Sequence, residues 1–472
     1  MLAACKNFIK ENKILCSILL ADIIGILLTF IFNSVILADE LEHLRNSYLI
    51  SIGYIPYRDF FEHHNPLLWI IFSPLFKILP LNVTLYFYIA RFTALICSAI
   101  SLYFGYLIVK RFLKSAEIFG YFVVFLFIFY PSWYCFSVFK PDVFARMFYI
   151  FGLYLYFCYL ENLQTRKLFL CALCFVISFL FLQTIVFSIL PLAIPTIYLF
   201  YKNKKFWYDA FICSLLPACI LFICVWLLTK YGIWDLYIQL NIIFNSKLFS
   251  LLYPNTPSML WYWSPYIIAA VLGWILILKN STSIYWRICG LLFICELLQH
   301  IYFPAVLPHY LILLFIFSSL SLAFLYNKHK TSSVKIFVCP LLFVNFILNL
   351  FTLYQHNNWD KIKFLQQINQ TENNQVLNIE YGYINIFSKP LHYYSTGFNN
   401  LVIIDDYLFH RFPEYNVNDM VLKYKPQYIN AQKPENFSFP EADRLTLQEE
   451  SLQNYEKIAD ELYRRKDFSA DE

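Results

Sequence analysis

Residues 83–109 read VTLYFYIARFTALICSAISLYFGYLIV and contain a single charged side chain, Arg91. At a rise of 1.5 Å per residue, a helix of about 20 apolar residues crosses the ~30 Å hydrocarbon core of a bilayer. The whole chain has the same character, because 60% of its residues are hydrophobic and only 14% are charged. Soluble domains contain about 45–50% apolar residues. The composition therefore predicts an all-α polytopic membrane protein and excludes a soluble globule.

Similar apolar segments recur along the chain. We predict eleven membrane-spanning helices, at 14–37, 83–109, 116–138, 143–160, 168–182, 184–201, 208–229, 264–279, 288–303, 309–326 and 334–354. The first follows three lysines, as a signal peptide does, but it is longer than the ~7–15 apolar residues of a cleavable signal. We therefore interpret it as a span that stays in the protein.

Basic residues in the loops predict the orientation, because Lys and Arg of short loops stay on the cytoplasmic side. One side carries most of them: Lys6, Lys10, Lys13, Lys110, Arg111, Lys114, Arg166, Lys167, Lys202, Lys204, Lys205, Lys279, Arg287, Lys328, Lys330 and Lys335. The loops of the other side carry Arg45, Arg58, Lys77, Lys140, Lys230 and Lys247. These residues predict a multi-pass protein of the bacterial inner (plasma) membrane, with a cytoplasmic N-terminus and a periplasmic C-terminal tail.

The tail differs from the rest in composition and predicts a second domain. Residues 1–354 form the predicted transmembrane domain, and residues 355–472 form a small periplasmic α/β domain. Alternating apolar stretches at 375–379 and 401–404 indicate strands, and segments 359–368 and 447–465 indicate helices.

The charge distribution bears on partners. A formal net charge of +5 is small and comes from basic residues dispersed between apolar segments. Nucleic-acid-binding domains instead concentrate Lys and Arg on one face. We expect membrane lipids as the surroundings and no nucleic acid as a partner.

The first outer loop, residues 38–82, is rich in ionisable side chains. Residues 40–52 place Leu41, Leu44 and Tyr48 on one helical stripe with charged residues elsewhere, which predicts an amphipathic helix lying in the membrane interface. Residues 66–79 are apolar but too short to span, and they predict a second interfacial helix.

A polar cluster lies between these two predicted helices. It comprises Arg58, Asp59, Glu62, His63 and His64, and Asp39 precedes the first helix. Gly53 and Pro56 predict a shaped turn that brings acid, base and cation to one face of the bilayer. The alternative is that these side chains simply face water and lipid headgroups, as most loop charges do.

Two further positions lie on the same predicted face. The third and fourth spans are joined by Phe139-Lys140-Pro141-Asp142, where the charges are either functional or a structural ion pair with Arg146. His309 and Tyr310 begin the tenth span after Pro308. A histidine there either binds a metal or phosphate, or starts the helix by bonding to the backbone.

These residues resemble the GT-C membrane glycosyltransferases, which include the protein O-mannosyltransferases and the lipid A aminoarabinose transferases. The resemblance is carried by Asp39-Glu40 after the first span, by residues 53–66 (GYIPYRDFFEHHNP) with the apolar LLWIIFSPLF that follows, by Lys140-Pro141-Asp142, and by the late PHY at 308–310. It covers the membrane region in order and spacing, and the tail only as an outer α/β domain.

The resemblance implies an inverting transfer of a sugar from a polyprenyl-phosphate donor to a periplasmic acceptor, such as lipid A or lipopolysaccharide, a surface glycan or a protein. Asp39 would be the catalytic base that accepts the proton of the acceptor hydroxyl. The leaving phosphate needs cationic or hydrogen-bonding partners. The residues that would bind the donor phosphate or substrate are Glu40, Arg58, His63, His64, Lys140, Asp142, His309 and Tyr310.

The resemblance leaves metal dependence open. In some relatives the counterpart of Glu62 and histidines hold a divalent ion, and Glu62, His63 and His309 are the candidate ligands here. The aminoarabinose enzymes have a lysine where this chain has His63. No organic cofactor is expected.

Two other classes of function compete with the enzyme. The first is a secondary transporter or lipid-linked glycan flippase, whose sites lie near the middle of the membrane. Ionisable residues within the predicted spans are few: Asp22, Arg91, Arg146 and Glu296. The second is a catalytically silent assembly partner, which the presence of Asp39 disfavours.

Overall fold

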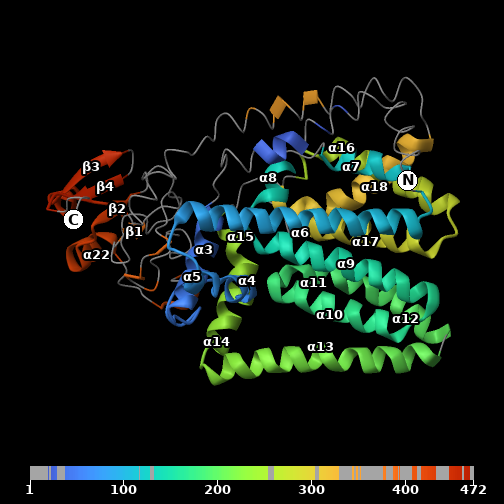
Figure 1. Cartoon of the computed structure of the whole chain (residues 1–472), viewed down its shortest axis with the longest axis horizontal. Coiled ribbons are helices and arrows are strands. Elements are labelled where there is room, and N and C mark those ends of the chain that lie inside the picture. The colour runs from blue at the N-terminus through green and yellow to red at the C-terminus, as the bar shows by residue number, and fades with distance from the viewer. Residues whose placement is uncertain are drawn as a thin grey trace. The chain divides into compact units, whose positions relative to one another are not determined.

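The computed structural model is mostly helical and ends in a small sheet (Figure 1). It describes residues 38–115, 117–127, 132–202, 204–252, 260–302 and 308–328, and shorter pieces at 17, 20, 23–28, 343–344, 347–348, 351, 376–378, 386–387, 389–391, 393, 405, 407–411, 416–431, 446–459 and 462–467. The described residues form two compact units, and each unit is assembled from three stretches of sequence.

Unit 1 comprises Met1–Val35, Arg91–Cys224 and Asn255–Asn357, and unit 2 comprises Ile36–Ala90, Val225–Pro254 and Asn358–Glu472. The last stretch of unit 2 begins close to the predicted domain boundary at 355. The same unit also contains the first outer loop, so the tail packs with that loop in one body. The division into domains 1–354 and 355–472 stays a prediction.

Unit 1 is a bundle of apolar helices. Its helices are α7 (Ile118–Phe127), α8 (Ser132–Ser137), α9 (Pro141–Asn162), α10 (Thr165–Phe181), α11 (Val186–Ile189), α12 (Ala193–Lys202), α16 (Ser264–Asn280), α17 (Ile284–Tyr302) and α18 (Ile312–Lys328). Short 3-10 turns occur at Gln183–Ile185, Leu190–Leu192 and Pro308–Leu311. The long helices α6 (Val83–Arg111) and α13 (Lys204–Lys230) contribute residues to both units.

Small residues let the helices of the bundle approach closely. A Cβ atom on Gly273 of α16 would lie 2.2 Å from the Ser321 hydroxyl of α18, and one on Gly152 of α9 would lie 2.7 Å from the Phe175 ring of α10. The Ser321 hydroxyl in turn donates a 2.8 Å hydrogen bond to the carbonyl of Ala270. Packing through small and hydroxyl side chains is typical of helices that associate in membranes.

Four helices in the described part of the chain are long and apolar enough to cross a membrane: Val83–Arg111, Pro141–Asn162, Lys205–Lys230 and Ile284–Tyr302. Shorter apolar helices coincide with four more of the predicted spans: Ile118–Phe127, Gln183–Leu199, Ser264–Asn280 and Ile312–Lys328. These helices are consistent with a membrane protein, while the total of eleven spans stays a prediction. Most of the predicted spans 14–37 and 334–354 lies outside the described residues.

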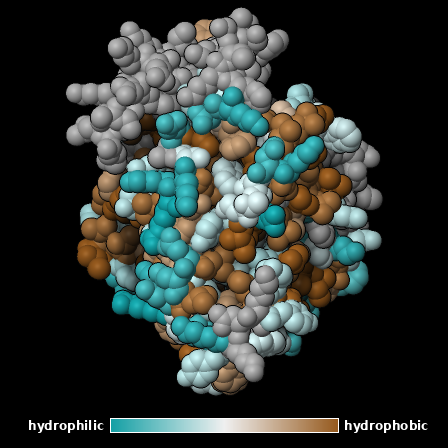
Figure 2. All heavy atoms as spheres, turned by 90° about the vertical axis from the view of Figure 1, so that its right-hand side faces the viewer, coloured by the Kyte–Doolittle hydropathy of each residue, from teal (hydrophilic) through white to brown (hydrophobic). Residues whose placement is uncertain are grey.

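Exposed basic residues mark the helix ends on one side of unit 1: Lys110, Arg111, Lys114, Arg166, Lys205, Lys279, Arg287 and Lys328. Arg111 pairs with Glu161 at 2.5 Å, and the Lys205 ammonium donates to the carbonyl of Leu163 at 2.9 Å. These contacts join the ends of α6, α9 and α13. Figure 2 shows hydrophilic residues in a band across this side, with hydrophobic residues beside the band.

Unit 2 contains the first outer loop as three helices, α3 (Ala38–Ser51), α4 (Leu67–Phe72) and α5 (Leu75–Ile78). It also contains one long helical stretch made of α14 (Trp234–Tyr237), a π-helical segment (Ile238–Phe244) and α15 (Asn245–Leu252). The tail supplies helix α22 (Val417–Tyr424) and a small sheet.

The helix predicted at 40–52 is present as α3, but its polar side does not face outward. Glu40, Glu42, His43, Arg45 and Asn46 are all at most 1% exposed. The reason is tertiary packing, since α4 lies against α3 and partners within unit 2 bind its polar groups. The expectation of an interface-lying amphipathic helix is therefore wrong for α3.

The turn predicted after α3 is confirmed. Gly53 has φ +97°, and its N–H donates to Ile50 O at 3.1 Å while the Tyr54 N–H donates to Leu49 O at 3.0 Å. This pair of bonds is the Schellman pattern, which ends a helix at a residue in the left-handed region. Glycine suits that position because it has no Cβ atom to clash.

The stretch predicted at 66–79 as a second interfacial helix forms α4 and α5, joined at Ser73-Pro74. Leu68, Trp69 and Phe72 are buried, whereas Ile70 and Ile71 are about half exposed. The segment thus presents apolar side chains outward as well as inward, which favours an apolar or interfacial surrounding.

The tail contains a four-stranded sheet of order β1-β2-β4-β3, with β1 (Val376–Asn378), β2 (Tyr428–Asn430), β3 (Tyr455–Ala459) and β4 (Leu462–Arg465). β1 and β2 are parallel, and the other neighbours are antiparallel. The strand predicted at 375–379 is confirmed as β1. The segments 401–404 and 359–368 lie outside the described residues.

The helix predicted at 447–465 is wrong. This segment forms a 3-10 turn (Glu449–Leu452) followed by β3 and β4. Its Glu, Lys and Leu residues favour a helix only weakly, and tertiary context overrides such propensity. Here Leu462 is fully buried and pairs with Asn430 of β2, so the sheet determines the local structure.

Candidate functional site

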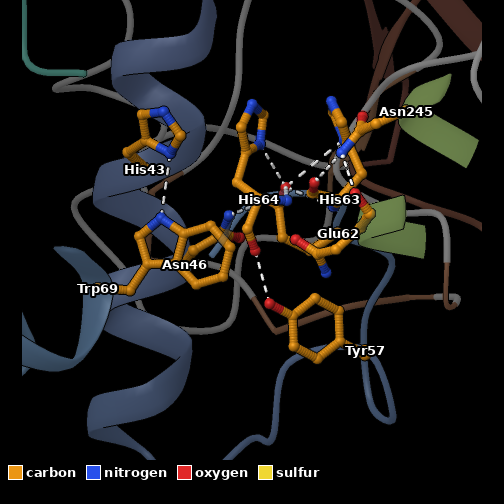
Figure 3. A network of polar contacts seen from close by, with 9 residues as sticks. His43, Asn46, Tyr57, Glu62, His63, His64, Trp69 and Asn245 are labelled. Atoms are coloured by element: carbon orange, nitrogen blue, oxygen red, sulfur yellow. Dashed lines mark hydrogen bonds and ion pairs between the residues drawn. The ribbon is translucent and has the colours of Figure 1, made fainter. Parts of the chain in front are cut away.

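The centre of the site is the turn at Glu62-His63-His64, which lies against α3 within unit 2 (Figure 3). The Glu62 Oε1 atom accepts hydrogen bonds from the backbone N–H of His63 at 2.7 Å and of His64 at 3.1 Å. The His64 Nδ1 atom lies 2.7 Å from the same oxygen. The Glu62 side chain is completely buried, so this carboxylate organises the turn from inside.

One face of α3 supplies the next groups. Asp39, His43 and Asn46 recur at spacings of four and three residues, which places them on one side of a helix. The Asn46 amide donates to Glu62 Oε2, and the His43 ring centre is 5.2 Å from that of His64. Trp69 Nε1–H donates to His43 Nδ1 at 3.0 Å and fixes that ring (Figure 3).

Asp39 belongs to the same electrostatic environment. It lies in the first turn of α3, where the helix dipole favours negative charge, and it is half-buried. Its carboxylate acts to raise the pKa of His63, which places it within electrostatic range of the turn. Asp39 therefore acts electrostatically on the turn, while Glu62, His63 and His64 lie together in it.

Burial and neighbouring charge set the protonation of the turn. Burial alone would raise the pKa of Glu62, but the histidines, His64 most strongly, outweigh it and lower this pKa to about 2. Burial, with repulsion from His64, lowers the pKa of His63 to about 3 against the opposing effect of Glu62 and Asp39. Glu62 is thus an anion at neutral pH beside a neutral His63, and His64 is the histidine that lowers the pKa of Glu62 most strongly.

The carbonyl groups of the turn are held by residues from the helical stretch 234–252. The Asn245 amide donates to His63 O at 2.7 Å. With its amide nitrogen toward the turn, Asn241 donates to His63 O at 3.1 Å and to His64 O at 3.3 Å. Tyr237 donates to Asn65 Oδ1 at 2.9 Å. The π-helical segment aligns these groups, and such segments are frequent at functional sites.

Tyr57 binds the turn from the other direction. Its hydroxyl donates to His64 O at 2.6 Å, and its backbone has φ +67°. The tail secures this residue, because Tyr393 donates to Tyr57 O at 2.7 Å and the Phe61 N–H donates to Tyr393 O at 2.7 Å. Burial raises the pKa of Tyr57 well above its ordinary value, so the phenol remains a donor.

Sequence reasoning missed these supporting residues. Asn241, Asn245 and Tyr393 lie far from the turn along the chain, and no motif marks them. The local signal is the four-residue spacing of Asn241 and Asn245, which puts two amides on one face of a largely apolar helical stretch.

Two predicted residues of unit 2 lie apart from the turn. Glu40 is fully buried but follows Asp39 by one position, about 100° around the helix. Arg58 is exposed and pairs with Asp59, its Nε and Nη2 lying 2.8 and 3.0 Å from the carboxylate oxygens. Arg58 is therefore not part of the cluster around Glu62.

The remaining predicted residues belong to unit 1. Lys140 is buried and precedes Pro141, the first residue of α9, and Asp142 is half-buried in the first turn of that helix. Tyr310 packs beside the hydrophobic core of unit 1, and His309 lies in the 3-10 turn Pro308–Leu311. Arg146, one turn below Asp142, donates to Cys135 O at 3.3 Å.

Three residues of the turn match a metal-binding pattern. Glu62, His63 and His64 each offer one ligand atom within 4.8 Å of the others. The hydrogen bonds do not suit Glu62 as a ligand, however, because N–H groups of His63 and His64 already point at Oε1. A cation bound there would face the positive ends of those groups. The arrangement thus does not fit a divalent ion held by Glu62.

No protein-family model and no curated protein matches this chain. The geometry of the turn and of α3 therefore carries the functional argument.

Proposed function

We propose that this protein is an inverting glycosyltransferase that moves a sugar from a polyprenyl-phosphate donor to an acceptor on the periplasmic side of the membrane. Asp39 is the base, and the turn at Glu62-His63-His64 serves the donor phosphate. The GT-C-like architecture with eleven spans, and the location in a bacterial inner membrane, are parts of the same proposal.

One observation carries the proposal: Asp39 lies within electrostatic range of His63, on the face of α3 that holds the buried turn. A transferase of this kind needs an ionised carboxylate beside the acceptor hydroxyl and donors beside the leaving phosphate. Asp39 supplies the first, and His64, whose side chain is 22% exposed, supplies a donor. General base catalysis contributes about 10²–10⁴-fold to the rate.

The bonds change in one displacement. The acceptor O–H proton passes to an Asp39 oxygen while the acceptor oxygen forms a bond to the anomeric carbon. The bond from that carbon to the phosphate oxygen breaks, and its electron pair leaves with the polyprenyl phosphate. Attack opposite the leaving group inverts the anomeric carbon.

The substrate-binding role of Lys140, Asp142, His309 and Tyr310, which belong to unit 1, stays a prediction from the resemblance. Membrane lipids surround the apolar helices. The acceptor is a lipid A or lipopolysaccharide, a surface glycan or a protein. The exposed basic residues at one set of helix ends in unit 1 support a cytoplasmic location for those ends.

A second candidate, transport of a substrate or a lipid-linked glycan, is favoured by a polar pair inside α17. Glu296 and His300 are each at most 4% exposed, and their side chains approach to 3.9 Å. Buried ionisable residues within spans often mark transport routes. Transport would depend on Glu296, whereas sugar transfer would depend on Asp39.

The test is Asp39→Asn in membranes supplied with a labelled polyprenyl-phosphate sugar. We expect the variant to be produced at the normal level and to lose transfer by at least about 100-fold, since the amide cannot accept a proton. Asp235→Asn is the matched control, because Asp235 is also in the first turn of a helix but is exposed.

Retained transfer in Asp39→Asn would remove Asp39 from the mechanism. Loss of movement of the labelled lipid-linked sugar across the membrane in Glu296→Gln, with normal movement in Asp39→Asn, would favour the transport function instead. Detergent gel filtration of each variant separates lost chemistry from lost folding.

A further inference from the structure

The two oxygens of Glu62 play different roles. Oε2 accepts from Asn46 on α3, and Oε1 accepts from two backbone N–H groups of its own turn. Backbone N–H groups can only donate, so Oε1 is an acceptor and carries no proton. Asn46 donates to Oε2 as well, so both oxygens accept, as they do in an ionised carboxylate. A buried anion with this many donors is a fixed structural charge.

The charge of Glu62 determines the state of His64. Because Oε1 carries no proton, the Nδ1 atom 2.7 Å away must be the donor. The Nε2 atom then lies on the far side of the ring. A carboxylate on one ring nitrogen fixes the orientation of an imidazole and favours the protonated ring, as it does for catalytic and metal-binding histidines.

The backbone of His64 is fixed as firmly as its ring. Tyr57 and Asn241 both donate to its carbonyl, and its N–H donates to Glu62. Within the turn, His64 has the most exposed side chain, at 22%, compared with 9% for His63 and 0% for Glu62. His64 is therefore the member of the turn that reaches the surface of the cluster.

We propose that Glu62 is a positioning residue and not a metal ligand, and that it holds His64 with Nε2–H directed at the phosphate of the donor. Asn46 donates to Glu62 Oε2 and holds that carboxylate in place, so Asn46 is also a positioning residue. This inference rests on the proposed transferase function. In the transfer step the Nε2–H bond stays intact and donates to the phosphate oxygen that receives the electron pair, so no proton leaves His64.

The first experiment measures the metal content of the full-length protein purified without chelator, by mass spectrometry, together with transfer in EDTA. We expect much less than one divalent ion per chain and unchanged transfer. One tightly bound ion per chain that is absent from Glu62→Gln, with transfer lost in EDTA, would overturn the proposal.

The second experiment compares His64→Ala with Glu62→Ala. We expect both to lose transfer about 100-fold, and added imidazole to restore a measurable part of the rate in His64→Ala alone. Imidazole can replace the missing ring while Glu62 remains to orient it, whereas Glu62→Ala has no anchor. Rescue of both variants, or of neither, contradicts the positioning role.

A third readout separates this inference from the proposed function. We expect His64→Gln to weaken binding of undecaprenyl phosphate to the purified protein about tenfold, and the control Asp235→Asn to leave it unchanged. Normal binding by His64→Gln overturns the inference while the transferase proposal stands. Absence of both binding and transfer in the unaltered protein overturns the transferase proposal itself.

Discussion

The interface between α16 and α18 and the contact between α3 and the turn at Glu62 are both buried, but they are built differently. Between α16 and α18, the polar atoms bond to nearby helix backbone, as when Trp274 Nε1–H donates to Phe317 O at 3.1 Å. At the turn beside α3, buried polar groups meet partners from distant segments, such as the Asn245 amide, which donates to His63 O across 182 positions. The first region is a packed scaffold, and the second is a preorganised polar site whose members depend on one another.

The largest effect is expected where the scaffold is tightest. Gly273→Leu would place a side chain where even a Cβ atom lies 2.2 Å from the Ser321 hydroxyl and 2.9 Å from Leu325. Overpacking of this kind costs about 1–3 kcal/mol or more, and here the helices must separate. We expect the variant to elute as aggregate in detergent gel filtration.

The matched control is Gly105→Leu in α6, where a Cβ atom meets nothing within 4 Å. We expect this variant to elute like the unaltered protein. If both leucine variants behave alike, the close approach of α16 and α18 is not what holds the bundle.

A smaller but functional effect is expected from Asn245→Ala. The change removes the 2.7 Å bond to His63 O and leaves a buried carbonyl with fewer donors, which costs about 1–3 kcal/mol. We also expect roughly tenfold less transfer, because the His64 ring loses its fixed position. Thermal unfolding and initial rates measure the two effects.

Asn280→Ala is the control, since the Asn280 amide likewise donates to a carbonyl at 2.7 Å, that of Leu276, but is exposed. It should change neither stability nor rate. An Asn245→Ala protein that is destabilised yet fully active would show that the turn tolerates movement. It would contradict the idea that sugar transfer requires a rigid turn.

The same contrast explains what the sequence could predict. The apolar helices follow from composition, and the end of α3 follows from Gly53. The proximity of Asp39 to the turn was also predicted, because both lie in one loop. These features are set by nearby residues, which a sequence displays directly.

The burial of α3 and the partners Asn241, Asn245 and Tyr393 could not be predicted. A stripe of Glu, His and Arg is typical of an exposed helix face. In α3 this face is buried because distant segments of the chain pack against it. Tertiary pairing likewise produced strands at 455–465, where the local residues favour a helix. Sequence pattern fails where burial depends on long-range polar contacts.

A modest effect is expected at the turn after α3. Gly53→Ala puts a Cβ atom on a residue with φ +97°, which costs about 1–2 kcal/mol, although nothing lies within 4 Å of that atom. We expect a lower melting temperature and a normal transfer rate at 25 °C. Gly105→Ala, in a helix with open space, should be neutral or stabilising, and an equal loss in both variants would contradict the conformational explanation.

The smallest effect is expected at Arg58. It decides whether Arg58 binds the donor phosphate, as the resemblance implies, or lies outside the site, as the structure indicates. The resemblance assigns Arg58 to the donor phosphate, but its guanidinium is exposed and engaged by Asp59. Exposed pairs contribute little to stability, and the turn around Glu62 does not use this one. Arg58→Ala should therefore keep its melting temperature and its KM for the donor, while His64→Gln raises that KM. A raised KM in Arg58→Ala would mean that Arg58 leaves Asp59 for the phosphate when donor binds, and the site would then extend beyond the buried turn.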